Sequence, residues 1–434
     1  MKNAKMRIFF VITQAEWGGA QTFVYRAALE AIRRGHEVLV SAGGEGELEK
    51  RCISANIPYK KLKKIERNIN PLAEISAVFE LVSAMKEWKP DVAFLFSAKA
   101  GVIGAIAARL AGVKRVVYRI GGWSFLDPVS NFQKIIRTWS ERIIAPFKNV
   151  IIVQHPGDEA LAIAKHIRPR QHITVISNGL DVNAFDQTLL PREEAREELE
   201  ALSGINRSEE RPARNASQGS VCVAGGGACV PRSFSEGGRS EKTLIVTIAN
   251  FYATKDISNL LHAANIVRQK KSDVQFIVIG DGGDQREEIY ALRKTLGLES
   301  IVAFPRMIPT AQTLLSGADI FLLSSAKEGN PWALHEAMAA RLPCVVTDVG
   351  ACAWLLNQGV GRGAWGVGEE SPSDDSHAGW VVPAKNPEAL ANAIIDALDH
   401  PEEAKRRGEL ARRIVETKFT EAEMWEKTFK ELGN

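Results

Sequence analysis

The sequence has 434 residues, of which 45% are hydrophobic and 25% charged, and its formal net charge is +3. This length predicts two or three domains with a sizeable core, and no run of about 18 apolar residues indicates a transmembrane helix. The five cysteines are scattered and lie outside any zinc-binding spacing, which fits reduced thiols in a cytosol.

Charge is unevenly distributed along the chain. Residues 1–170 carry 27 Lys and Arg against 15 Asp and Glu, a net of +12, whereas the remainder has a net of −9. The densest basic clusters are Lys60–Lys64 and the segment 134–148. A solvated surface is the commonest explanation of such clusters, and an anionic membrane surface is the sharper alternative. No nucleic-acid partner is expected, because no aromatic interleaving or binding motif accompanies the charge.

The first half alternates apolar runs with helical patterns. Residues 6–13 are predicted to form a buried strand rather than a signal peptide, since the apolar run is short and no cleavage site follows. The turn at Gly18–Gly19 then leads into a helix over 21–34. Further strands are predicted at 37–42, 91–96, 114–119, 150–154 and 173–176, and helices at 71–88, 99–111, 131–147 and 158–165.

The helix predicted over 131–147 has one apolar side. That side carries Ile135, Ile136, Trp139, Ile143 and Ile144, with basic residues on the other faces. It suits either a core or a membrane interface. We expect core, because the surface helices of globular domains show the same pattern.

Two polar stretches interrupt the alternation. Residues 203–241 are rich in Gly, Ser, Arg and Glu and predict a disordered insert between two domains. A second polar insert is expected at 359–377. The first domain is therefore placed at 1–182 and the second at 242–417, with residues 418–434 as a separate last helix.

The second half repeats the alternation of strand and helix. Strands are predicted at 244–248, 274–279, 301–304, 320–323, 344–346 and 380–382, and the last helices at 386–398, 402–417 and 421–432. Such alternation predicts an α/β protein whose two domains are both doubly wound on parallel sheets.

The most informative stretch is 320–346, which predicts strand, loop, helix and strand. Glu328 lies in the loop and Glu336 on the second turn of the helix, which Pro331 can start without losing a hydrogen bond. In a parallel sheet the ligand crevice opens at this end, and the free N–H groups of the helix start suit a phosphate. One Glu near a helix start is usually a cap or a solvated charge. The pair of Glu residues together with Gly329, Asn330 and Pro331 is a more specific indication of a functional site.

Residues 328–351, EGNPWALHEAMAARLPCVVTDVGA, resemble the Glu-x7-Glu motif of glycosyltransferase family 4. The resemblance extends to ITQAEWGGAQ, SAKAGVIGAIAARLAG, GGWSF and SNGLD in the first half and to NFYATKD, IGDGGD and GADIFLLSS in the second. It covers nearly the whole chain apart from the two inserts. It implies the GT-B architecture, in which two Rossmann-like domains face a deep cleft and the last helix, here 418–434, crosses back to the first domain.

The resemblance also implies retaining transfer of a sugar from a nucleotide sugar, without a metal. Lys255 and Glu328 are the expected catalytic residues, Lys255 at the β-phosphate and Glu328 at the donor sugar. Glu336 is expected to hold the ribose hydroxyls. The remaining donor-binding residues that the resemblance implies are Gly18, Gly19, Asn250, Gly280, Met307, Gly329, Asn330, Pro331, Trp332 and Leu334.

Three positions depart from the family's pattern. Asn250 stands where an Arg is usual, Gly121 replaces the His of the HGW motif, and Trp354 stands where a Glu is expected after TDVGG. The resemblance implies that Asn250 removes one charge at the phosphate and that Gly121 removes a contact to a donor hydroxyl or an acid-base helper.

The expected function is that of a cytoplasmic enzyme, peripheral on the inner membrane face, in cell-surface polysaccharide or lipopolysaccharide synthesis. The expected donor is a UDP-sugar, and no other cofactor is expected. The expected acceptor is a glycan or a polyprenyl-phosphate-linked sugar. Two alternatives stay open: another GT-B enzyme such as a nucleotide-sugar epimerase, and a non-catalytic sugar-nucleotide-binding protein, which the residues at 121 and 354 suggest.

Overall fold

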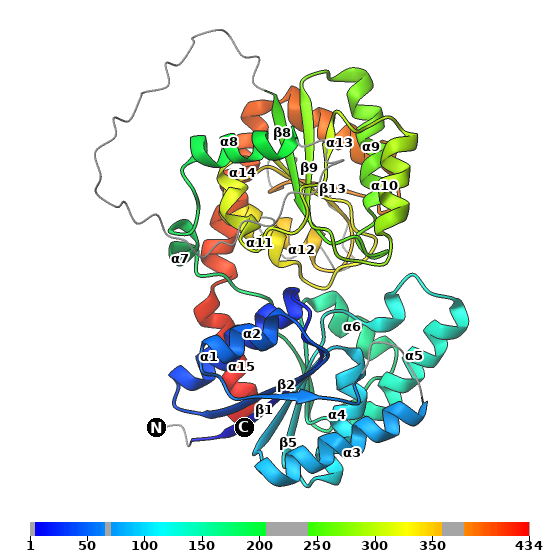
Figure 1. Cartoon of the computed structure of the whole chain (residues 1–434), viewed down its shortest axis with the longest axis vertical. Coiled ribbons are helices and arrows are strands. Elements are labelled where there is room, and N and C mark those ends of the chain that lie inside the picture. Colours follow the sequence, from blue (N-terminus) through cyan, green and yellow to red (C-terminus); the bar gives the residue numbers. More distant parts are fainter. Residues whose placement is uncertain (1–4, 66–70, 205–241, 358–376, 434) are drawn as a thin grey trace, which may run out of the picture.

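The computed structural model describes residues 5–65, 71–204, 242–357 and 377–433. Two domains, each built around a parallel sheet, are stacked along the long axis of the molecule, with the first domain below the second in Figure 1. The predicted fold class, two doubly wound Rossmann-like domains, is confirmed. Most of the two predicted inserts, at 203–241 and 359–377, lies outside the described residues.

The first domain contains a seven-stranded sheet in the order β3-β2-β1-β4-β5-β6-β7. Side chains alternate across a strand, so Ile8 and Phe10 of β1 enter the hydrophobic cluster on one face, and Phe9 and Val11 enter the cluster on the other. Both faces are therefore covered, as is usual for a parallel sheet. The strands are β1 (Arg7–Gln14), β2 (Glu37–Gly43), β3 (Tyr59–Leu62), β4 (Val92–Phe96), β5 (Arg115–Arg119), β6 (Val150–Val153) and β7 (His172–Val175).

Helices cover the two faces of this sheet. α1 (Gly19–Arg33), α2 (Glu47–Ser54) and α15 (Glu421–Gly433) contribute to the cluster on one face. α3 (Pro71–Trp88) and α4 (Ala98–Leu110) contribute to the cluster on the other. The remaining helices are α5 (Asn131–Ile144) and α6 (Pro156–Ala164), with 3₁₀ helices η1 (Ser124–Leu126) and η2 (Ala145–Phe147).

The second domain contains a six-stranded parallel sheet in the order β10-β9-β8-β11-β12-β13. Phe321 and Leu323 of β11 enter the cluster on one face, and Ile320 and Leu322 enter the cluster on the other. The strands are β8 (Thr243–Ile248), β9 (Val274–Ile279), β10 (Val302–Ala303), β11 (Ile320–Leu323), β12 (Cys344–Thr347) and β13 (Trp380–Val382). The helices are α8 (Arg192–Ser203), α9 (Ile257–Lys270), α10 (Arg286–Thr295), η3 (Ala311–Gly317), α11 (Trp332–Ala339), α12 (Cys352–Leu356), α13 (Pro387–Asp399) and α14 (Pro401–Lys418).

Two segments pass between the domains side by side. Leu180, just before the short helix α7 (Val182–Asp186), forms a parallel bridge with Thr420. Phe419 still packs in the second-domain core, whereas Trp425 and Phe429 pack in the first-domain core. The chain therefore returns to the first domain at residue 420, and α15, red in Figure 1, lies against the lower sheet.

The expectation that the apolar side of the helix at 131–147 forms core is wrong for most of its residues. α5 buries Ile144 and Glu141 at its end. The side chains of its remaining large apolar residues are 52% to 71% exposed: Phe132, Ile135, Ile136, Trp139 and Ile143. An amphipathic pattern shows that a helix has an apolar side, but it does not show what covers that side.

The entry into the second domain also differs from expectation. α8 precedes residue 205, yet its Leu199 is buried in the second-domain core. Its Arg196 pairs with Asp319, Nη1 to Oδ2, at 3.0 Å. The segment 205–241 therefore joins two elements of the second domain, α8 and β8, instead of separating the domains. Because residues 192–203 are mostly charged, the sequence pattern gives little indication of the apolar face with which this helix packs on the second-domain core.

Candidate functional site

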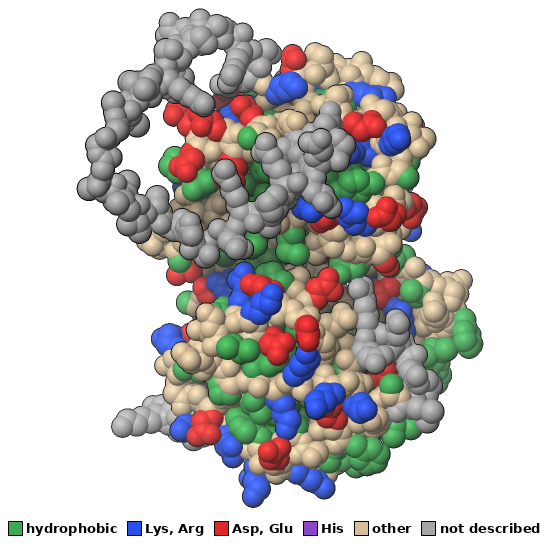
Figure 2. Space-filling view, viewed as in Figure 1, with side chains coloured by type: hydrophobic (Ala, Val, Ile, Leu, Met, Phe, Trp, Pro, Cys, Tyr) green, Lys and Arg blue, Asp and Glu red, His purple; other side chains and the backbone are tan. Residues whose placement is uncertain are grey.

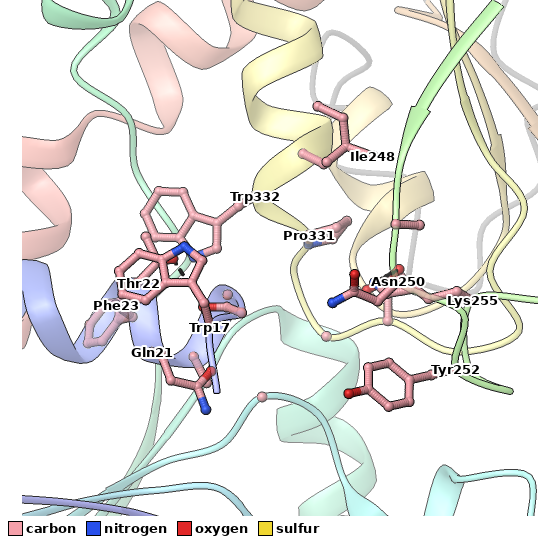
Figure 3. A pocket seen from close by; sticks show the side chains of 18 of the residues that line it. Trp17, Gln21, Thr22, Phe23, Ile248, Asn250, Tyr252, Lys255, Pro331 and Trp332 are labelled. Atoms are coloured by element: carbon pink, nitrogen blue, oxygen red, sulfur yellow. Dashed lines mark hydrogen bonds and ion pairs between the residues drawn. The ribbon is translucent and has the colours of Figure 1, made fainter. Parts of the chain in front are cut away.

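A cavity of about 700 Å³ lies between the two domains. Its walls come from the carboxyl ends of β1, β4 and β5 in the first domain and of β8, β9 and β11 in the second. Ligands of open parallel sheets bind at this end of the strands. Figure 3 shows Trp17 and Gln21 of the first domain across the cavity from Asn250, Tyr252 and Lys255 of the second.

Lys255 and Glu328 form an ion pair on the second-domain wall of the cavity. Lys255 Nζ lies 2.6 Å from Glu328 Oε1, and Ser325 Oγ donates to the same oxygen at 2.6 Å. The Glu328 side chain is only 8% exposed, so the two donors hold its carboxylate in place. Two of the predicted catalytic groups are therefore in direct contact.

Helix α11 begins at the cavity wall. Pro331 precedes its first turn, and no side chain caps its first N–H groups. Uncapped N–H groups and the helix dipole together favour an anion at this end. Pro331 and Trp332 are both part of the cavity wall in Figure 3.

Glu336 lies on the second turn of α11 and lines the same cavity. Burial raises the pKa of Glu336 to about 7, and the nearby Arg26 guanidinium opposes this shift. Arg26 belongs to α1 of the first domain, with its Cζ 5.0 Å from the centre of the Trp332 ring. A carboxylate here can accept hydrogen bonds from two adjacent hydroxyls of one ligand.

Glycines let backbone segments approach closely around the cavity, between the two domains and within the second. A Cβ on Gly329 would lie 2.4 Å from the carbonyl oxygen of Gly121, and one on Gly19 would lie 3.2 Å from Cδ1 of Trp332. Gly280 has a φ of +151°, and a Cβ there would lie 2.0 Å from the Ala249 carbonyl oxygen. A side chain at 280 or 329 would therefore displace the backbone that bounds the cavity.

Asn330 connects the two domains at the cavity wall. Its carbonyl oxygen accepts from Asn178 Nδ2 at 2.7 Å, and its own Nδ2 donates to Ser177 Oγ at 2.6 Å. Its Oδ1 is 2.5 Å from His335 Nε2. Burial lowers the pKa of His335 to about 3, so the ring is neutral at pH 7. Because Asn330 Oδ1 can only accept, this contact requires the ring form that carries its proton on Nε2.

The predicted site residues gather at this cavity with one exception. Leu334 is fully buried in the second-domain core, and its N–H donates to the Pro331 carbonyl at 3.2 Å. It lies two positions from Glu336, and residues at that spacing face different sides of a helix. The cavity is lined by Lys255, Glu328, Glu336, Gly18, Gly19, Asn250, Gly280, Met307, Gly329, Asn330, Pro331 and Trp332.

Two positions at which the sequence departs from the resembled family have different surroundings. Gly121 lines the cavity, and among the described residues beyond its chain neighbours no atom lies within 4 Å of a Cβ built on it. The first atom of a side chain at this position would therefore meet open space. Trp354 packs edge-on against Phe419, with ring centres 5.1 Å apart, and is not part of the cavity wall.

Sequence reasoning missed several first-domain residues of the cavity wall, among them Phe23, Arg119 and Asn178. One signal could have found Arg119. It is the last residue of a predicted strand, and polar residues at the carboxyl ends of parallel strands face the ligand crevice. Nothing in the sequence indicates that Phe23, inside a helix pattern, lies next to it.

Comparison with known proteins gives two family models. "Glycosyltransferase Family 4" matches residues 17–184, and "Glycosyl transferases group 1" matches residues 232–414. Among the curated relatives is the UDP-Gal:alpha-D-GlcNAc-diphosphoundecaprenol alpha-1,3-galactosyltransferase of Escherichia coli. It is 24% identical over 65% of this chain, and the match spans 64% of that enzyme, slightly less than two thirds of its length.

Solved structures share the fold over nearly the whole chain. HepE of Anabaena, crystallised in complex with UDP and glucose, has a TM-score of 0.73 at 18% identity, covering 98% of this chain and 99% of that one. WaaG, a glycosyltransferase involved in lipopolysaccharide biosynthesis, has a TM-score of 0.68 at 15% identity, covering 98% and 99%. At these identities the likeness shows the fold, which is the two-domain GT-B architecture.

Proposed function

We propose that this chain, a glycosyltransferase of the GT-B fold and the family 4 type, transfers a sugar from a UDP-sugar with retention at the anomeric carbon. One observation carries the proposal: Lys255, Glu328, Glu336 and the uncapped start of α11 line one cavity between the domains. That cavity offers positive groups for a diphosphate and carboxylates for the hydroxyls of two sugars.

Lys255 and α11 stabilise the leaving group. Negative charge develops on the diphosphate as the bond to the anomeric carbon breaks, and positive groups fixed beforehand lower that barrier. At about 4 Å an ammonium and a phosphate oxygen interact by roughly 4 kcal/mol in a partly screened site. Lys255 is held by Glu328 before the donor arrives, and it shares this contact with the β-phosphate afterwards.

The two carboxylates position the donor. Glu336 accepts from the ribose hydroxyls, and Glu328 accepts from hydroxyls of the transferred sugar. The acceptor hydroxyl attacks from the face that the phosphate leaves, and a phosphate oxygen takes its proton. Glu328 is not assigned as a covalent nucleophile, because in this proposal the acceptor itself attacks on the face that the phosphate leaves.

The relatives support a nucleotide and an acceptor class. The E. coli enzyme is named for UDP-galactose and a diphosphoundecaprenol-linked sugar, and HepE is described with UDP and glucose. On that likeness the donor here is a UDP-sugar and the acceptor is a glycan or a polyprenyl-phosphate-linked sugar. The pathway is cell-surface polysaccharide or lipopolysaccharide synthesis at the cytoplasmic face of the membrane.

The test is an assay of the full chain with a panel of labelled UDP-sugars and isolated membrane lipids. Glu336→Ala should lower kcat/KM for the donor by about a hundredfold, whereas Glu388→Ala, at the start of α13 and outside the cavity wall, should leave it unchanged. Proton NMR of the product reports its anomeric configuration. Full activity of Glu336→Ala would remove the ribose assignment. Sugar interconversion without an acceptor would instead indicate an epimerase, and UDP binding without turnover a non-catalytic binding protein.

The second part of the proposal is that the exposed apolar residues of α5 contact an anionic membrane. In Figure 2 hydrophobic side chains gather at the right-hand edge of the lower domain, where Figure 1 places α5. The acidic residue of this helix, Glu141, is buried against Lys148 at 2.9 Å, whereas Arg142 is exposed beside Trp139. The charge that α5 presents to solvent is therefore basic, as an interfacial helix on anionic lipid requires.

The basic cluster Lys60–Lys64 supports the membrane contact less well than α5. Lys60 pairs with Glu87 at 2.9 Å and Lys61 with Glu45 at 2.7 Å, so half of this cluster is neutralised locally. No helix among the described residues has the length and apolar character to cross a bilayer. Burying the five half-exposed side chains of α5 would contribute on the order of 5 kcal/mol, which suits reversible association.

Co-sedimentation with vesicles of phosphatidylcholine and phosphatidylglycerol tests this contact. The double variant Ile136→Ser with Trp139→Ser should bind at least about tenfold more weakly, because it removes two apolar side chains. Ile53→Ser is the matched control, since Ile53 is 63% exposed on α2, on the other side of the domain in Figure 1. Equal sedimentation of the double variant and the wild type would refute the role of α5.

A further inference from the structure

Arg119, the last residue of β5, is a buried cation on the first-domain wall of the cavity. Its Nη2 donates to Asn178 Oδ1 at 3.0 Å and to the Ile176 carbonyl at 3.3 Å. Its Cζ lies 4.0 Å from the centre of the Phe23 ring. Within the described residues, neither Nε nor Nη1 has a hydrogen-bond partner.

The other buried arginines of the described residues all have a carboxylate. Arg412 pairs with Asp186 at 2.7 Å, Arg407 with Glu403 at 2.6 Å and Arg115 with Glu431 at 3.8 Å. Arg119 has no carboxylate within ion-pair distance in the described part of the chain, and only burial shifts its pKa, to about 9. The guanidinium is therefore charged at neutral pH. An unpaired buried charge is costly to folding, which indicates a site that a ligand completes.

The other cations of the cavity wall are already paired. Lys255 contacts Glu328, and Lys327 contacts Asp127 of the first domain. Arg119 is thus the cation of the described cavity wall that has no counter-ion. Its neighbour Phe23 is one turn inside α1, a helix of 15 residues with no side-chain cap and no acidic residue in its first turn. An arginine beside uncapped N–H groups is suited to the oxygens of a phosphate.

We propose that Arg119 binds a phosphate group of a substrate in this cavity. The inference rests on the proposed function, in which the donor carries a diphosphate and the polyprenyl-phosphate-linked form of the acceptor carries a phosphate. Asn178 accepts a hydrogen bond from the Arg119 guanidinium and donates one, at 2.7 Å, to the carbonyl oxygen of Asn330 just before α11. The position of the guanidinium is therefore coupled to the contact between the domains. Occupation of Arg119 therefore favours the arrangement in which both cavity walls are in place.

Calorimetric titration of the full chain tests the proposal without requiring sugar transfer. Arg119→Gln should weaken phosphate binding by roughly tenfold to a hundredfold, the usual effect of losing hydrogen bonds to a charged group. Arg115→Gln is the matched control, since Arg115 is a buried arginine of the same strand outside the cavity wall. Two probes separate the sources: UDP compared with uridine for the donor, and inorganic pyrophosphate added to the UDP-saturated protein for the acceptor.

A loss confined to UDP assigns Arg119 to the donor, and a loss confined to pyrophosphate assigns it to the acceptor. Binding of both probes within twofold of wild type, in a variant that melts cooperatively, would overturn the proposal. If Arg119→Gln does not fold, the same titrations are made with Arg119→Lys, which keeps the buried charge. Wild-type protein that binds neither UDP nor pyrophosphate would also overturn it. Phosphate binding that depends on Arg119 in a protein without transfer activity would instead refute only the proposed function.

Discussion

Glu336→Gln should stabilise the ligand-free protein at pH 8 and leave its stability nearly unchanged at pH 5. Burial raises the pKa of Glu336 from 4.5 to about 7. Between these values the folded protein keeps a proton that the unfolded chain releases, so the free energy of unfolding falls as pH rises. The difference corresponds to roughly 3 kcal/mol above pH 7, at about 1.4 kcal/mol per pKa unit. This is an upper value because the cavity is open to water.

Melting curves of the wild type and the variant at pH 5 and pH 8 measure this effect. Glu403→Gln serves as a control of opposite sign, because Arg406 and Arg407 lower the pKa of Glu403 to about 2. The stabilisation that ionised Glu403 gives is present above pH 4.5 and is lost only as pH falls toward 2. Glu403→Gln should therefore melt at a lower temperature than wild type, by the same amount at pH 5 and at pH 8. A Glu336→Gln difference that does not change between the two pH values would refute the buried-carboxyl argument.

The same carboxyl group should make nucleoside binding depend on pH. Only the ionised group accepts hydrogen bonds through both oxygens, so wild-type affinity for uridine should fall by up to about tenfold per pH unit below pH 7. Uridine is chosen because a phosphate titrates near pH 6 and would obscure the change. The affinity of Glu336→Gln should be lower at pH 8 and independent of pH. A flat wild-type profile would show that ionised Glu336 does not hold the ribose.

Three further predictions follow from the geometry of the cavity. Lys255→Met should lower kcat for transfer by about a hundredfold or more, because it removes the ammonium at the leaving group. Single-turnover kinetics with a UDP-sugar measure the chemical step, and an unchanged rate of that step would contradict the role of Lys255. Gly329→Ala should lower kcat/KM by at least about tenfold, because the added Cβ would lie 2.4 Å from the Gly121 carbonyl oxygen. Gly204→Ala, whose added Cβ has its nearest described neighbour 3.9 Å away, should not lower kcat/KM. Gly121→His should fold as the wild type does, since no atom of the described residues beyond its chain neighbours lies within 4 Å of a Cβ at this position; a lowered melting temperature would contradict this open space.

The sequence alone was enough to predict the architecture and the second-domain half of the site. The repeated alternation of apolar strands and helices specifies parallel sheets, because each element must bury its apolar side against the next. The motif containing Glu328 and Glu336 is contiguous, so its loop and helix start bring the two carboxylates to one strand end without reference to the rest of the chain. Lys255 follows a different strand of the same sheet and reaches the same edge for the same reason.

Only the tertiary structure decided which first-domain groups face that motif and which apolar sides stay uncovered. Asn178 and Asn330 are separated by 152 positions and meet because two segments carry the chain between the domains. Arg119 becomes an unpaired cation only because Phe23 and Asn178 close around it without supplying a carboxylate. The exposure of the apolar side of α5 and the burial of Leu334 also depend on which distant segments pack against these helices. Periodicity determines which residues share a side of a helix, whereas the packing of distant segments determines whether that side meets protein, ligand or solvent.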